Sequence, residues 1–222
     1  MDTELKISAL SKLIESEDLA FLKGSYHKVS EFMNGKFYDS RFITPYSKSS
    51  HNIHSDFLLI LQDWASEDYL KNNSKDEYIP LGHDPRLPTN KFLKELLKRH
   101  LNYDLQDLYT INLFPYIKKG TMNQKIPSHD LFYATKKFAL PVLGIIKPKW
   151  VFAFGIDVYN QLRKIVNLKG VKFKDNEHIF KINNIKIMLL PHPGGPGTAS
   201  MGGKINVHAY WKMMKDIIDA EI

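Results

Sequence analysis

The stretch Asp56-Phe-Leu-Leu-Ile-Leu-Gln-Asp63 decides the fold, because a continuous apolar run stops abruptly at a glutamine and an aspartate. A short run of this kind fits a strand that is buried on both faces, which is typical of a parallel sheet covered by helices. Three further runs have the same form and cover residues 108–114, 150–154 and 185–190. We therefore expect four such strands at the centre of the molecule.

Helical and turn-rich segments surround these runs. Apolar residues recur at helical spacing over residues 3–23, 90–100, 129–146, 157–167 and 206–218. Residues 173–182 are typical of a strand, and Asn183-Asn184 would turn it into the last run. The alternation predicts an α/β fold with three α/β/α layers and a central, mainly parallel four-stranded sheet.

The domain organisation follows from what the sequence lacks. No internal repeat or linker divides the chain, so we expect a single domain over residues 1–222. Residues 24–55 are polar and rich in turn residues. We therefore expect residues 1–50 to form a helical and loop extension that packs on the rest of the domain.

Composition excludes several classes of protein. Of 222 residues, 43% are hydrophobic and 25% charged, which is typical of a globular chain. The sequence contains no cysteine, so disulfides, thiolate nucleophiles, cysteine-ligated zinc and iron–sulfur clusters are excluded. The apolar runs are shorter than the roughly 20 residues that cross a bilayer. The first residues, MDTELKISALSK, lack the features of a signal peptide. We expect a soluble, cytoplasmic protein without membrane contact.

The charge is distributed unevenly. The net charge is +7, yet residues 116–222 carry 17 basic and 7 acidic side chains, while residues 56–115 carry 7 basic and 10 acidic ones. A basic surface beside an acidic pocket suits a polyanion such as DNA that undergoes chemistry at one point. The alternative is that these lysines are ordinary solvated residues on helix surfaces.

Polar residues follow the predicted strands where ligands usually bind. In open α/β sheets the ligand site lies at the carboxyl ends of the strands. The first run ends at Gln62-Asp63, the second contains Asn112 near its end, and the last is followed by His192. We expect Asp63, Asn112 and His192 to converge on one crevice.

Four motifs follow one another along the chain: Leu-Ile-Leu-Gln-Asp at 59–63, Asn112 within Ile-Asn-Leu-Phe-Pro, Lys-Pro-Lys-Trp-Val-Phe-Ala-Phe-Gly at 147–155 and Leu-Pro-His-Pro-Gly at 190–194. In this order they resemble the motifs of the uracil-DNA glycosylase superfamily. The resemblance covers roughly residues 50–215. The absence of cysteine indicates a divergent branch without an iron–sulfur cluster.

The sequence also departs from the best-known family. Leu61 replaces a glycine, and Trp64-Ala65 replace Pro-Tyr, whose tyrosine excludes the methyl group of thymine. The Gly-Gly-Pro-Gly stretch at 194–197 replaces the loop that intercalates into DNA. Selectivity for uracil alone therefore stays open.

The resemblance implies two catalytic side chains. Asp63 would stabilise the positively charged sugar and orient or deprotonate the attacking water. His192 would donate a hydrogen bond to the oxyanion that develops on the departing base. The alternatives are a strand-end aspartate that caps a turn and a histidine that merely packs.

Base binding is assigned to four residues. The resemblance implies that Gln62 and Asn112 contact the base, and the amide of Asn112 can match the N3–H and O4 of uracil and reject cytosine. Its alternative role is to tie loop backbone at the sheet end. A flipped base must also stack on an aromatic face, for which Trp64 or Tyr78 is the candidate.

Contacts to the DNA backbone are assigned to residues that flank the predicted crevice. Glycines permit close approach of phosphates because they lack a Cβ atom. The candidates are Lys118, Lys119, Gly194, Gly195 and Lys204. Each lysine could equally be an ordinary solvated residue, and the glycines could equally form a simple loop.

The resemblance implies a monofunctional DNA glycosylase of base excision repair that uses no metal or cofactor, has DNA as its partner and acts as a monomer. The glycine-rich stretch is no phosphate loop, because Ile205 follows Gly203-Lys204 where serine or threonine is needed. Two alternatives stay open: a DNA-binding protein that keeps the fold without glycosylase activity, and a glycosylase for another damaged base.

Overall fold

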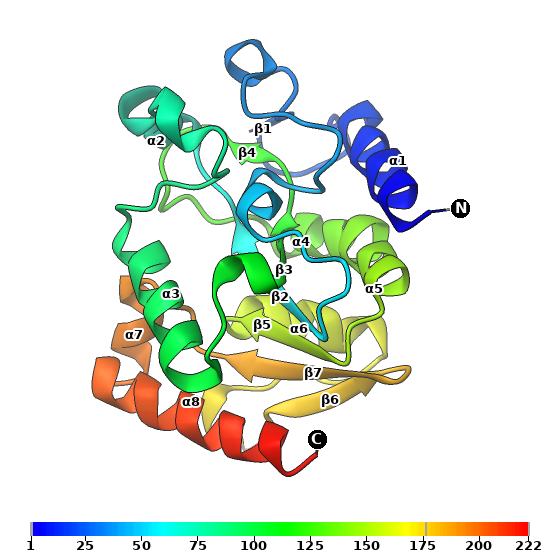
Figure 1. The fold of residues 1–222 in the computed structure, drawn as a ribbon. Coiled ribbons are helices and arrows are strands. Elements are labelled where there is room, and N and C mark those ends of the chain that lie inside the picture. Colours follow the sequence, from blue (N-terminus) through cyan, green and yellow to red (C-terminus); the bar gives the residue numbers. More distant parts are fainter. Residues whose placement is uncertain (1, 176, 222) are drawn as a thin grey trace.

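The central sheet has five strands in the order β3-β2-β5-β7-β6, seen across the middle of Figure 1. In this computed structural model, which describes residues 2–175 and 177–221, the apolar runs form the parallel strands β2 (Phe57–Asp63), β3 (Tyr109–Phe114), β5 (Trp150–Phe154) and β7 (Ile185–Leu190). The α/β class and the mainly parallel sheet are thus confirmed.

The expectation of a four-stranded sheet was wrong, because the sheet has a fifth strand, β6, at its edge. β6 (Ile179–Ile182) pairs with β7 in antiparallel register, with Ile182 opposite Ile185. The turn between them places Asn183 at φ 52°, a left-handed conformation that asparagine tolerates. Residues 173–175 form a short 3₁₀ turn instead of extending this strand.

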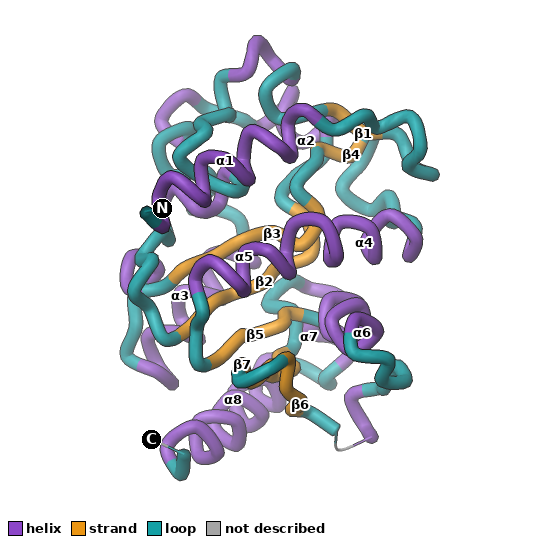
Figure 2. The backbone as a smooth tube through the Cα atoms, turned by 90° about the vertical axis from the view of Figure 1, so that its right-hand side faces the viewer, coloured by secondary structure: helices purple, strands orange, loops and turns teal. Residues whose placement is uncertain are grey.

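Helices cover both faces of the sheet and make three layers, which Figure 2 shows from the side. One face carries α3 (Pro88–Leu101) and α8 (Lys204–Asp219); the other carries α1 (Thr3–Ser16), α4 (Ser128–Ala134), α5 (Leu140–Ile146) and α6 (Ile156–Ile165). Successive strand residues alternate between faces. Leu59 and Leu61 therefore pack with α3 and α8, whereas Leu58 and Ile60 pack with the second group.

The helices differ from the sequence expectation mainly at their ends and junctions. The first stops at Ser16 instead of continuing to residue 23. Residues 135–139 form a π-helical segment between α4 and α5, within the single helix expected over 129–146. The short helices α2 (Glu67–Asn73) and α7 (Gly195–Ser200) were not expected.

The N-terminal fifty residues contribute more than an extension. Ile7, Leu10 and Ile14 of α1 belong to the same apolar cluster as the central strands. β1 (Tyr26–His27) pairs in antiparallel register with β4 (Ile117–Lys118), which directly follows the end of β3. The extension thereby fixes the backbone of Lys118.

Among the described residues, no helix is long and apolar enough to span a bilayer.

Candidate active site

A cavity of about 660 Å³ opens at the carboxyl ends of β2, β3, β5 and β7. The chain runs from β2 through α3 to β3, which lies on one side of β2. It later runs through α4 and α5 to β5, which lies on the other side of β2. Such a reversal of strand order creates a crevice at the strand ends. The cavity lies at this crevice, and the first turn of α3 forms its opposite wall.

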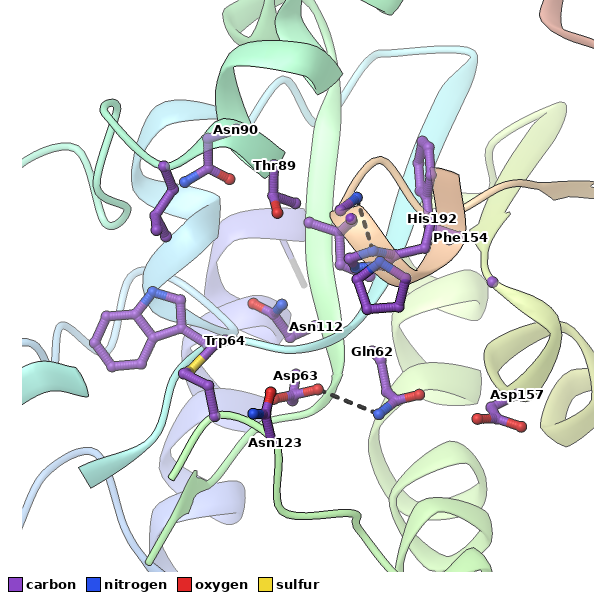
Figure 3. Close-up of a pocket in the computed structure, with 18 of the residues that line it drawn as sticks. Gln62, Asp63, Trp64, Thr89, Asn90, Asn112, Asn123, Phe154, Asp157 and His192 are labelled. Carbon is purple, nitrogen blue, oxygen red and sulfur yellow. Dashed lines mark hydrogen bonds between the residues drawn. The ribbon is translucent and has the colours of Figure 1, made fainter. Parts of the chain in front are cut away.

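Asp63, Asn112 and His192 all line this cavity, and Figure 3 shows them around one hollow. Asn112 lies opposite Leu61 in the parallel register, and Asp63 follows two residues later on the same strand as Leu61. The two-residue period of a strand therefore brings Asp63 and Asn112 to the same face. The expected convergence of the three side chains is confirmed.

The carboxylate of Asp63 is held by two neighbours. Its Oδ2 lies 2.8 Å from the ammonium of Lys118, and its Oδ1 accepts a hydrogen bond of 3.3 Å from Gln62 Nε2. Lys118 is only 4% exposed and also donates to the carbonyl of Met122 at 2.8 Å. The charge of Asp63 is thus compensated within the protein, while the carboxylate still faces the cavity.

The amide of Asn112 is buried but lacks hydrogen-bond partners. The residue is 3% exposed, and neither Oδ1 nor Nδ2 has a partner among the described residues. A buried polar group without a partner costs about 1–3 kcal/mol. Because the side chain also lines the cavity, a ligand that pairs with both atoms would recover this free energy.

His192 carries its proton on the nitrogen that the protein leaves unbonded. The backbone N–H of Gly194 donates to Nδ1 at 3.0 Å, so the neutral ring must carry its hydrogen on Nε2. Burial lowers the pKa of His192, although the charge of Asp63 opposes the shift. A Cβ at position 194 would lie 2.9 Å from Nδ1, so only glycine allows this contact without a shift. The site presents a neutral N–H donor.

Aromatic side chains form one wall of the cavity. The indole of Trp64 is fixed by a 2.7 Å hydrogen bond from Nε1 to the carbonyl of Gly82. Tyr46 and His83 also line the cavity, and their rings stack at 4.8 Å with 17° between the planes. Ala65 instead packs in a separate apolar cluster, so its side chain does not shape the cavity as the resemblance implied.

His83 contributes a second buried atom without a partner. It is 5% exposed, and burial lowers its pKa to about 4, so its ring is neutral at neutral pH. Nδ1 lies 3.0 Å from both the carbonyl of Leu81 and the hydroxyl of Ser49. A hydrogen on Nδ1 would satisfy the carbonyl and leave Nε2 as an acceptor. Nε2 has no partner among the described residues.

Two of the predicted contact residues, Tyr78 and Lys118, lie elsewhere than expected. Tyr78 does not line the cavity, and the guanidinium of Arg86 lies 4.8 Å from its ring centre. Lys118 is inside the cavity and bound to Asp63 instead of exposed to DNA phosphates. Lys119 and Lys204 are exposed and outside the lining, which is compatible with the predicted contacts to the DNA backbone, and Gly194 and Gly195 form part of the lining.

Sequence reasoning missed several residues that form the cavity. The first turn of α3 contributes Thr89 and Asn90, and the segment 122–125 lies at the opening. Tyr46 comes from the loop before β2, where nothing in the sequence indicated a site. The Asn112–Pro115 stretch indicated the strand-end wall of the cavity. The pairing of Asp63 with Lys118 depends on tertiary contacts that no local pattern encodes.

Within residues 2–175 and 177–221, no three histidine, aspartate or glutamate side chains gather as a metal site would require. The cavity lining includes the carboxylate of Asp63, the ammonium of Lys118, the amide of Asn112 and the imidazole of His192. Together they can polarise a neutral heterocycle, stabilise an anion and orient a water molecule. A comparison with models of known protein families finds no match, and a comparison with curated proteins finds no similar sequence.

Proposed function

We propose that this chain is a DNA glycosylase that hydrolyses the N-glycosidic bond of uracil, or of a related deaminated base, after the base has flipped out of DNA. The unpartnered amide of Asn112, in one cavity with Asp63 and His192, is the observation that carries the proposal. Uracil offers an adjacent N–H donor and carbonyl acceptor, which complement the two atoms of an amide. Cytosine offers an acceptor and an amine in these places.

The proposed chemistry uses the two sides of the cavity differently. As the bond breaks, positive charge develops on the sugar and negative charge on the base, and the enzyme must stabilise both in the transition state. The Nε2–H of the neutral His192 would donate to the developing oxyanion. Asp63 would face the sugar and orient the attacking water, with Gln62 fixing its second oxygen.

Base flipping requires room and an aromatic surface. A cavity of about 660 Å³ is large enough for a base and its sugar. Trp64 stays a candidate for stacking, and the stacked pair Tyr46 and His83 is a second aromatic surface in the same lining. The excess of basic residues in the C-terminal half would attract the DNA backbone.

A DNA-binding protein without glycosylase activity is the second candidate, and one observation favours it. Lys118 compensates the charge of Asp63, which reduces the electrostatic support that the carboxylate gives to a sugar cation. This candidate predicts DNA binding that weakens with salt and leaves every base in place.

The experiment that separates the two candidates is a panel of duplex oligonucleotides, each with one uracil, one hypoxanthine or another deaminated base. Base release leaves an alkali-labile abasic site, which a denaturing gel detects. We expect release from at least one duplex, and its loss in Asp63→Asn. Asp157→Asn is the matched control, because this exposed carboxylate also lines the cavity and has no role in the proposed chemistry. Intact binding without release from any duplex would favour the second candidate.

A further inference from the structure

The buried ammonium of Lys118 is the group that base release leaves without a role. It lies in the cavity lining, is 4% exposed, and contacts Asp63 Oδ2 and the carbonyl of Met122, each at 2.8 Å. Its neighbour Lys119 is exposed, as a lysine that only attracts phosphates would be. The pairing of β4 with β1 fixes Lys118 in this inward position.

The position of Lys118 matters because the proposed function places the sugar of the flipped nucleotide close to it. If Asp63 faces the anomeric carbon of the sugar, the Nζ atom 2.8 Å from that carboxylate lies in the same part of the cavity lining as this carbon would. Once the base has left, the anomeric carbon of the abasic site opens to an aldehyde. A lysine amine beside an aldehyde forms an imine.

We propose that Lys118 forms an imine with the aldehyde of an abasic site, and that the protein thereby has a second activity that cleaves the DNA strand there. The inference rests on the proposed function for the position of the sugar, but it does not require that this protein removes the base itself. The ligand class is DNA that contains an abasic site.

The step begins with the loss of a proton from Lys118. An ammonium is not a nucleophile, but Asp63 Oδ2 lies at hydrogen-bond distance and can take its proton. When the sugar displaces water from the cavity, the cost of keeping both charges rises, which favours the neutral pair.

The covalent steps balance without a further reagent. The amine nitrogen bonds to the aldehyde carbon, the carbonyl oxygen is protonated, and loss of one water gives the imine. Asp63 gives its proton to the departing hydroxyl group, so the imine is left protonated. The carboxylate then takes a proton from the sugar carbon next to the imine, and this proton finally passes to solvent. The electron pair then expels the 3′ phosphate by breaking its carbon–oxygen bond. Addition of one water to the imine releases an unsaturated aldehyde and restores Lys118.

The test uses a labelled duplex oligonucleotide with one preformed abasic site, together with sodium borohydride. Borohydride reduces an imine to a stable amine, so protein and DNA stay joined on a denaturing gel. We expect an adduct with the wild-type protein, and about tenfold less or none with Lys118→Arg, because a guanidinium keeps the charge beside Asp63 but forms no such imine. Lys125→Arg is the matched control and should keep the adduct, because this exposed lysine also lines the cavity and has no role in the proposed chemistry.

Peptide mapping of the wild-type adduct gives a second readout that needs no variant. Reduced sugar on Lys118 supports the inference; reduced sugar on another lysine, an undiminished adduct in a folded Lys118→Arg protein, or no wild-type adduct overturns it. The abasic site is made beforehand, so a failure to release uracil does not affect this assay. Conversely, base release without an adduct would overturn only the inference.

Discussion

Two buried asparagines on opposite walls of the cavity differ in one respect. On the α3 wall, Asn90 is 6% exposed, accepts a hydrogen bond of 3.1 Å from the Tyr46 hydroxyl and donates one of 2.7 Å to the carbonyl of Asp84. On the strand-end wall, Asn112 is 3% exposed and neither of its amide atoms has a partner among the described residues. The first amide holds the wall together, and the second is available to a ligand.

The carboxylates of the two walls both have partners, but of different kinds. Burial of Asp84 raises its pKa, but hydrogen bonds from Arg86 and Tyr69 outweigh this and lower the pKa to about 2. Asp84 is therefore a permanent anion that fixes its loop. Asp63 is held by one lysine and one amide inside the cavity. Both carboxylates therefore have partners, and the contrast between satisfied and available groups rests on the two asparagine amides.

Asp63→Asn should have the largest effect on activity. We expect base release to fall by about 10³-fold, because the amide cannot accept a proton or carry the charge that faces the sugar. Affinity for DNA should change little, and single-turnover kinetics beside a binding titration will separate the two quantities. Activity within about twofold of wild type would remove Asp63 from the mechanism.

On the same side of the cavity as Asn90, His83 has a buried nitrogen without a partner among the described residues. Its titration should make the free energy of unfolding depend on pH. Its pKa is about 4 in the folded protein, against an ordinary value of 6.5. Between these values the unfolded chain binds a proton that the folded protein does not, so the free energy of unfolding should fall as pH drops from 6.5 to 4. The loss should reach roughly 3 kcal/mol.

Urea unfolding of wild type and His83→Gln at pH 7 and pH 4 checks this pH dependence. The variant lacks the titrating ring, so its loss of stability over the same interval should be smaller. Equal losses in both proteins would show that other groups control the acid sensitivity.

Alanine substitutions of Asn90 and Asn112 should have smaller effects, but effects of different kinds. Asn90→Ala should lower the free energy of unfolding by about 1–3 kcal/mol, because the carbonyl of Asp84 and the Tyr46 hydroxyl lose their partner. Asn112→Ala breaks no hydrogen bond of its side chain and should leave stability unchanged or raise it. Base release should fall more in the Asn112 variant than in the Asn90 variant.

Denaturant unfolding and initial rates on the same two preparations give this comparison. A larger loss of stability in Asn112→Ala than in Asn90→Ala would mean that the Asn112 amide has a structural role. This would contradict the inference that the Asn112 amide is available to a ligand.

The surface lysines should have the smallest effect. Lys204 is exposed and its ammonium lies 4.7 Å from the ring of Phe92, outside the cavity. Lys204→Ala should weaken DNA binding no more than severalfold, and only at low salt, as expected for a single phosphate contact. A binding titration at two salt concentrations measures this, and a loss of base release at saturating DNA would place Lys204 in the active site instead.

The strands and the convergence of three side chains were predictable, because both depend on short patterns. An apolar run that ends in Gln62-Asp63 encodes a buried strand and the polar residue at its carboxyl end. Tyr46 and Lys118 were not predictable as cavity residues, since the fold of the N-terminal extension places one and the pairing of β1 with β4 places the other. Such contacts between distant segments leave no periodic signal. Tyr78 lies in the polar segment 66–89 that follows Asp63, but the fold of this segment does not bring its side chain to the cavity.

The most direct test of the central claim is a crystal structure of the Asp63→Asn protein bound to a duplex that contains one 2′-fluoro-2′-deoxyuridine, whose glycosidic bond resists hydrolysis. The account predicts an extruded uracil in the cavity, with both amide atoms of Asn112 hydrogen-bonded to its edge and His192 Nε2 directed at a carbonyl oxygen. A duplex bound elsewhere, or a uracil still stacked in the helix while the Asn112 amide stays unpaired, would contradict it.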